Sequence, residues 1–194
     1  MNIKIWIALG VAALLVFYGV GVNNTLIEKE EGVNQAWAQV ENQYQRRADL
    51  IPNLVSTVRG AADFEQETLT QVVEARSRAT SMNIDAGDLN NPATFQQFQQ
   101  AQDQLSGALS RLLVTVERYP EIQANQNFRD LQVQLEGTEN RISTERMRFN
   151  QAAQEYNTTT RRFPASMFAN VLGFETKAYF QSQQGADTAP EVNF

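Results

Sequence analysis

The chain has 194 residues, with 16 basic and 22 acidic side chains and a formal net charge of −6. This acidic balance argues against nucleic acid as a partner, because binding phosphates requires a basic face. The chain contains neither histidine nor cysteine, which removes the commonest metal ligand, the neutral-pH acid–base group and the thiol nucleophile. We therefore expect no enzyme and no bound cofactor, and the composition favours anchoring and assembly.

The first 25 residues are predicted to form a transmembrane anchor. Residues 5–22 carry no charge, and as a helix they would reach about 27 Å, close to the thickness of a bilayer's hydrocarbon core. A cleaved signal peptide is the alternative, but its apolar region would be shorter and its cleavage site clearer. Only Gly19-Val20-Gly21 resembles such a site, and only weakly.

The flanking charges predict the orientation of this anchor. Lys4 and the α-amino group lie on one side, whereas the other side carries the mostly acidic run of residues 28–31. The positive-inside rule then places the N-terminus in the cytoplasm and the rest of the chain on the extracytoplasmic side. Because a single lysine carries this prediction, the opposite orientation stays open.

Beyond the anchor, apolar residues recur every three or four positions, which is typical of amphipathic helices. Gly60, the turn-rich residues 83–91 and Pro120 divide this pattern. The fold class predicted is all-α: an N-terminal transmembrane helix followed by an up-and-down four-helix bundle with long antiparallel helices. The domain spans residues 26–180 and comprises helices at about 26–59, 64–82, 92–118 and 125–162 and an aromatic segment at 163–180. A flexible tail at 181–194 follows it.

Two positions leave the first bundle helix open to alternatives. Pro52 removes a helical hydrogen bond, and we expect a kink between Ala48 and Pro52 rather than a break. The apolar pattern also continues across Gly60. A single kinked helix over residues 23–82, protruding as a stalk, is therefore the rival of a helix that ends near Gly60.

The last long helix has a regular seven-residue repeat. Large apolar residues recur at Phe128, Leu135, Ile142, Phe149, Tyr156 and Phe163. Such a repeat indicates neighbouring helices that cross at about 20°. It fits the core of the bundle, and a coiled-coil seam between subunits is the alternative.

One charged residue of the first bundle helix falls on its apolar face. An antiparallel alignment that places Glu31 level with Phe163 brings Arg47 opposite Met147, within one turn of Glu145. We therefore predict a buried Arg47–Glu145 ion pair, which would act as a register device or a polar partner site. The alternative is a set of ordinary surface pairs.

Two arginines followed by aromatic residues end the last helix. This pattern predicts possible membrane-interface contacts beside the anchor. The alternative is a hydrophobic flap that closes the end of the bundle. The residues concerned are Arg161, Arg162, Phe163, Phe168, Phe174, Tyr179 and Phe180.

Three blocks of sequence resemble the LemA family of bacterial membrane proteins. They are residues 36–55, with Gln45-Arg46-Arg47-Ala48-Asp49-Leu50-Ile51-Pro52-Asn53-Leu54; Tyr119-Pro120-Glu121-Ile122 with Thr138-Glu139-Asn140-Arg141-Ile142; and Phe149-Asn150, Tyr156-Asn157 and Phe163-Pro164. The resemblance implies one membrane helix, a four-helix bundle and no enzymatic activity. Relatives are often encoded near membrane metallopeptidases and TPM-domain proteins, which implies an adaptor role.

Three classes of function follow. We expect a membrane-anchored, non-enzymatic scaffold or self-assembling interaction protein of the bacterial cytoplasmic (inner) membrane, in contact with the bilayer and forming a homo-oligomer. An adaptor or regulator of a membrane protease, a TPM-domain protein or another envelope complex is the alternative, and a hydrolase that uses carboxylates alone is a third. Self-association would use one of two surfaces. The first consists of small residues of the anchor, Ala8, Ala12 and Gly19. The second is a glutamine-rich face formed by Gln96, Gln97, Gln99, Gln100, Gln102 and Gln104.

Overall fold

A computed structural model describes residues 3–60, 64–82 and 84–181. Within these residues the fold is all-α, as predicted, and contains no strand. The elements are α1 (Ile3–Arg59), α2 (Gln66–Ser81), the 3-10 helix η1 (Ala86–Asn90), α3 (Pro92–Val116), α4 (Pro120–Ala124), α5 (Gln126–Arg161) and α6 (Ala165–Leu172). Of the predicted flexible tail, all but Gln181 lies outside the described residues.

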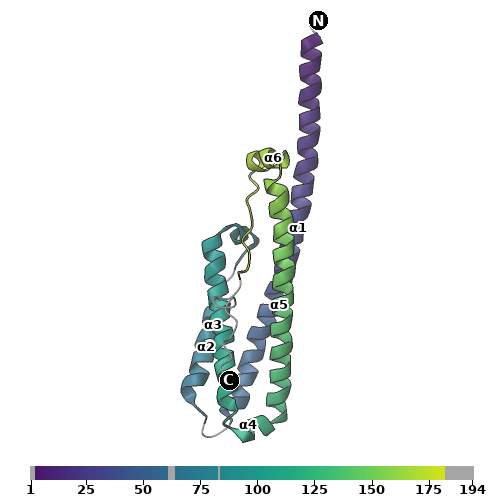
Figure 1. Cartoon of the computed structure of the whole chain (residues 1–194). Coiled ribbons are helices and arrows are strands. Elements are labelled where there is room, and N and C mark those ends of the chain that lie inside the picture. Colours follow the sequence, from purple (N-terminus) through teal and green to yellow (C-terminus); the bar gives the residue numbers. More distant parts are fainter. Residues whose placement is uncertain (1–2, 61–63, 83, 182–194) are drawn as a thin grey trace, which may run out of the picture.

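Helix α1 is continuous over 57 residues, which makes it about 85 Å long. Its N-terminal part extends alone past every other element, and the remainder packs against them (Figure 1). The anchor and the first helix of the body, which the sequence predicted separately, are therefore one helix. Because α1 ends at Arg59, the rival prediction of a single helix running on to Met82 is wrong.

Pro52 lies inside α1 without ending it, and a side chain from α2 explains how. A proline has no N–H, so the carbonyl four residues earlier, that of Ala48, loses its helical partner. Arg76 of α2 donates from Nε to the Ala48 oxygen at 2.8 Å. The guanidinium therefore replaces the missing backbone donor at the point where α2 crosses α1.

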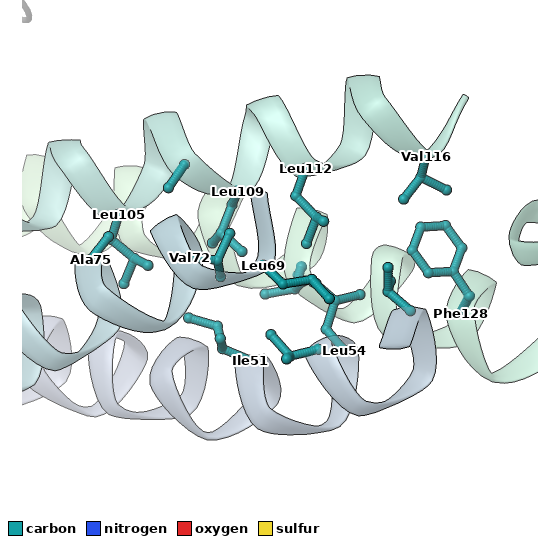
Figure 2. Close-up of a cluster of buried hydrophobic side chains, with 14 of the residues drawn as sticks. Ile51, Leu54, Leu69, Val72, Ala75, Leu105, Leu109, Leu112, Val116 and Phe128 are labelled. Atoms are coloured by element: carbon teal, nitrogen blue, oxygen red, sulfur yellow. The ribbon is translucent and has the colours of Figure 1, made fainter. Parts of the chain in front are cut away.

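The four long helices form two antiparallel pairs: α1 runs along α5, and α2 runs along α3 (Figure 1). Side chains from all four meet in a distal core, far from the protruding end of α1 (Figure 2). A proximal core lies nearer that end. The distal core includes Ile51, Leu54, Leu69, Val72, Leu105, Leu109, Leu112 and Phe128, and the proximal core includes Leu26, Val33, Trp37, Val40, Phe95, Phe98, Phe149, Tyr156 and Phe180.

After α6 the chain reverses and runs back along the body as an extended return segment, residues 174–181 (Figure 1). Gly173 makes the reversal possible, because its φ of 78° lies in the left-handed region that ends many helices. The Phe174 N–H then bonds the Ala169 oxygen at 3.0 Å. Neither α6 nor this reversal was predicted within the aromatic segment 163–180.

Side-chain amides hold the backbone of the return segment. Asn157 donates to the Lys177 oxygen and accepts from its N–H, at 2.9 and 2.8 Å. Asn150 forms the same reciprocal pair with Phe180, at 3.0 and 2.9 Å. Asn150 and Asn157 are seven residues apart on α5, and their partners Lys177 and Phe180 are three residues apart on extended chain. Both separations span about 10 Å, so both pairs form at the same alignment of the return segment along α5.

Substitution of Arg76 tests its role as the partner of the Ala48 carbonyl. We expect Arg76→Ala to lower the free energy of unfolding by about 1–2 kcal/mol, because it leaves that carbonyl without a donor. In a Pro52→Ala background the loss should be much smaller, since the backbone N–H of residue 52 is restored. Chemical denaturation of the full-length protein in detergent, followed by circular dichroism, measures both.

The matched control is Arg78→Ala, because Arg78 is exposed and only approaches Glu74 at 4.0 Å. Its substitution should change the free energy of unfolding by less than about 0.5 kcal/mol in either background. Additive effects of Arg76→Ala and Pro52→Ala would contradict the proposed role of Arg76.

Candidate functional site

Arg47 is the largest fully buried side chain of the described residues, with 1% of its surface exposed. Its Nη1 atom donates to Glu139 Oε1 at 2.6 Å and to Ser106 Oγ at 2.7 Å. Its Nη2 atom donates to Gln102 Oε1 at 2.6 Å. Gln102 in turn donates to the Ala79 oxygen at 3.2 Å, so this polar layer connects α1, α2, α3 and α5.

The polar layer lies between the two apolar cores. On α1, Tyr44 belongs to the proximal core and Ile51 to the distal core, and Arg47 lies between them. On α5, Glu139 lies between Leu135 and Ile142 in the same way. Sliding one helix by a turn would bury the charge of Arg47 against apolar neighbours, so the layer fixes the register of the four helices.

The prediction that Glu145 is the partner of Arg47 is wrong. Glu145 pairs instead with Arg148 on its own helix, at 2.8 Å. The alignment behind the prediction assumed that α5 ends level with Glu31. The Lys29–Glu155 contact at 3.5 Å shows that α5 reaches about two turns further toward the protruding end of α1, which brings Glu139 to Arg47.

A cleft of about 520 Å³ lies beside the polar layer, between α1, α3 and α5, and Gln181 of the return segment contributes to its wall. Arg146 and Asp103 face each other across it at 3.8 Å. The Tyr44 hydroxyl is buried and finds no hydrogen-bond partner within the described part of the chain. Burial raises the pKa of Tyr44 to about 12, which strengthens the preference of this phenol for its neutral form.

Among the described residues, no three potential ligands of the His, Cys, Asp and Glu types gather in one place. The charged groups around the cleft are paired with one another, as Arg47 with Glu139 and Arg146 with Asp103. The cleft therefore resembles a polar recess for binding more than a set of groups arranged for proton transfer.

The other candidate site is the end of the body from which α1 protrudes. Here α1 carries a stretch long and apolar enough to cross a membrane, and its side chains are exposed. Helix α6 lies against the last turn of this stretch. The ring of Phe168 packs 5.5 Å from that of Tyr18, and a Cβ added to Gly19 would come within 2.9 Å of it.

This contact bears on one predicted route of self-association. Gly19 was predicted to help join anchors within the membrane, together with Ala8 and Ala12. Because Phe168 of the same chain occupies its surface, Gly19 is not free for a second anchor.

The residues predicted as membrane-interface contacts fall into two groups. Arg161, Arg162 and Phe163 are exposed beside the anchor, and Phe168 touches it. The prediction is wrong for Phe180, which is buried in the proximal core, 4.7 Å from the ring of Phe95 and 6.1 Å from that of Trp37.

The other two residues belong to the return segment. Phe174 packs against the proximal core, and the Tyr179 hydroxyl accepts a hydrogen bond from Asn157 at 2.8 Å. Both residues therefore contact the side of the body, Tyr179 while it stays 41% exposed.

Sequence reasoning missed two features of this end. Lys177 is buried and its Nζ bonds Glu30 at 2.6 Å, which fastens the return segment to α1. The amide pairs of Asn150 and Asn157 were also missed. Their signal was the seven-residue repetition of an aromatic residue followed by asparagine, in Phe149-Asn150 and Tyr156-Asn157.

The fold and this end define the class: a membrane-associated protein with an all-α body and one N-terminal helix long and apolar enough to cross a membrane. The model of the LemA family matches residues 36–194, and the chain therefore belongs to the LemA family.

Named relatives include magnetosome proteins. Magnetosome protein MamQ 2 of Paramagnetospirillum magneticum is 27% identical, over 92% of this chain and 70% of its own length. Magnetosome protein MamQ of Magnetospirillum gryphiswaldense is 24% identical, over 96% and 75%. Protein LemA of Metamycoplasma hominis is 22% identical, over 87% and 73%.

A double-mutant cycle tests the polar layer. We expect Glu139→Gln to lower the free energy of unfolding by about 1–3 kcal/mol, because it leaves the buried charge of Arg47 with neutral partners alone. In an Arg47→Met background the same substitution should cost much less. Denaturant titrations in detergent of the unsubstituted protein, the two single variants and the double variant give the coupling free energy between Arg47 and Glu139. We expect it to exceed about 1 kcal/mol.

Glu145→Gln is the control for this cycle, since Glu145 contacts Arg148 and not Arg47. Its effect should be the same in both backgrounds. Coupling of Arg47 to Glu145 in place of Glu139 would contradict the observed register.

Substitutions at two phenylalanines that were both predicted as membrane-interface contacts should change stability by very different amounts. Phe180→Ala should cost about 3–5 kcal/mol of unfolding free energy, because it empties a place in the proximal core. Phe163→Ala should cost less than about 0.5 kcal/mol, because 76% of that side chain is exposed. Equal effects in thermal or chemical denaturation would argue against the burial of Phe180.

Proposed function

We propose that this protein is a membrane-anchored, non-catalytic interaction protein of the bacterial cytoplasmic membrane that assembles with further copies of itself. The observation that carries the proposal is the continuity of α1 from its apolar end into both cores. A helix without a hinge holds the body at a fixed height above the bilayer. Such a geometry suits a protein that presents a surface to neighbours in the same membrane.

The four long helices act in this proposal as one up-and-down four-helix bundle. The polar layer and the adjacent Arg76–Ala48 contact connect them midway along the body, and the return segment is fastened to α5 and α1 nearer the proximal end. The charges around the anchor support an extracytoplasmic body, with Lys4 on the cytoplasmic side. The naming of relatives as magnetosome proteins supports a role at a membrane.

A second function is favoured by the cleft beside Arg47. Its polar lining could receive a segment of another protein. In that case the chain would be an adaptor or regulator of a membrane protease, a TPM-domain protein or another envelope complex.

Measuring the mass of the full-length protein, extracted from its own membrane into polymer-bounded nanodiscs, separates these functions. Self-assembly predicts protein masses at multiples of 21.8 kDa, and the same multiples after cross-linking in the intact membrane. The adaptor function predicts one copy joined to a different protein. Single copies without any partner in both measurements would contradict the proposal.

A further inference from the structure

We propose that α6 lies in the boundary layer of the bilayer and is a second membrane contact beside the anchor. It would hold its outer face in the lipid headgroup and upper acyl region. The inference rests on the proposed anchoring of α1 and names the partner of the body's proximal end: the lipid surface itself.

The length of α1 beyond its contact with α6 carries the first step. Phe168 meets α1 at Tyr18 and Gly19. Lys4 bounds the uncharged stretch of α1, and from Ile5 to Tyr18 that stretch is only about 21 Å long. The hydrocarbon core is about 30 Å thick, so a spanning α1 brings α6 to the level where that core begins.

The side chains of α6 carry the second step. Its inner face packs against the body through Ala169, which is fully buried. Its outer face exposes large apolar groups: Met167 is 61% exposed, Val171 is 86% and the preceding Phe163 is 76%. These groups add to the exposed apolar surface of α1, and an apolar surface at this level suits lipid as its neighbour.

The flanking charges carry the third step. Arg161 and Arg162 end α5 directly before Phe163 and are both exposed. Long cationic side chains at this depth can extend toward the phosphate groups while their apolar stems stay in the boundary layer. Apolar groups outward and two arginines at the edge form the usual pattern of a helix that lies on a membrane.

The return segment makes this contact rigid. Helix α6 is fixed to α1 by Phe168, and the chain that follows it is fastened by the Lys177–Glu30 pair and by Asn157. The helix therefore cannot swing away from the body. Two contacts with the bilayer, one through it and one along it, would set the tilt of α1 as well as its height.

Spin labels test this position directly, because the chain has no cysteine of its own. Single variants Val171→Cys and Met167→Cys of the full-length protein would be labelled and reconstituted at one copy per nanodisc of phosphatidylcholine and phosphatidylglycerol. Power saturation then compares accessibility to oxygen, which enters lipid, with accessibility to a water-soluble nickel chelate. The matched control is Val133→Cys, an equally apolar position on α5 that is 67% exposed.

We expect the oxygen-to-nickel ratio at Val171 and Met167 to be several times that at Val133. A label at Leu14, on the exposed anchor, should give a higher ratio still. Adding Val171→Glu to the Met167 variant should lower its ratio toward that of Val133, because a charge opposes immersion.

Two outcomes would overturn the inference. Ratios at Val171 and Met167 equal to that at Val133 would place α6 in water. A high oxygen-to-nickel ratio that appears only when several copies share a disc would assign the outer face of α6 to a second copy of the chain. A low ratio at Leu14 would instead contradict the anchoring of α1, which keeps failure of the proposed function distinct from failure of this inference.

Discussion

Helix α1 has to satisfy two different surroundings with one unbroken backbone, and the rest of the structure depends on this constraint. Its first part exposes an apolar surface that is long enough to cross a membrane. Its second part buries one face, from Leu26 to Val58, against three other helices. No loop separates the two parts, so the proposed insertion of the first part in a bilayer would also set the height and direction of the body.

Polar contacts, more than apolar ones, fix how the other elements join α1. An apolar core tolerates exchanges between its side chains if volume is conserved, whereas a buried charge or an unpaired carbonyl requires one particular partner. Arg47 needs Glu139 and Gln102, the Ala48 carbonyl needs Arg76, and the return segment needs Asn150 and Asn157. Each of these pairs works at one register only. Together they make the helical body a single arrangement rather than a family of similar packings.

Local patterns in the sequence predicted the all-α class, the apolar anchor and the position of Arg47 on a buried face. They could not supply the partner of Arg47, because that depends on how far α5 reaches along α1. The Lys29–Glu155 contact marks that reach, and it joins residues more than a hundred positions apart, beyond the range of any local pattern. The return segment escaped prediction for a related reason. Its extended backbone is stabilised by asparagine side chains of α5, and its own residues carry no strand pattern.

The continuity of α1 at the membrane surface is the central claim, and a distance between two spin labels tests it most directly. Gly10 and Gly32 lie on either side of the end of the apolar stretch, and a side chain added at either would meet no neighbour within 4 Å. With labels at both positions in nanodiscs, a continuous helix predicts one narrow distribution of distances between backbones, centred near 33 Å. A broad distribution, or one centred well below that distance, would reveal a hinge where α1 leaves the bilayer and would contradict the account.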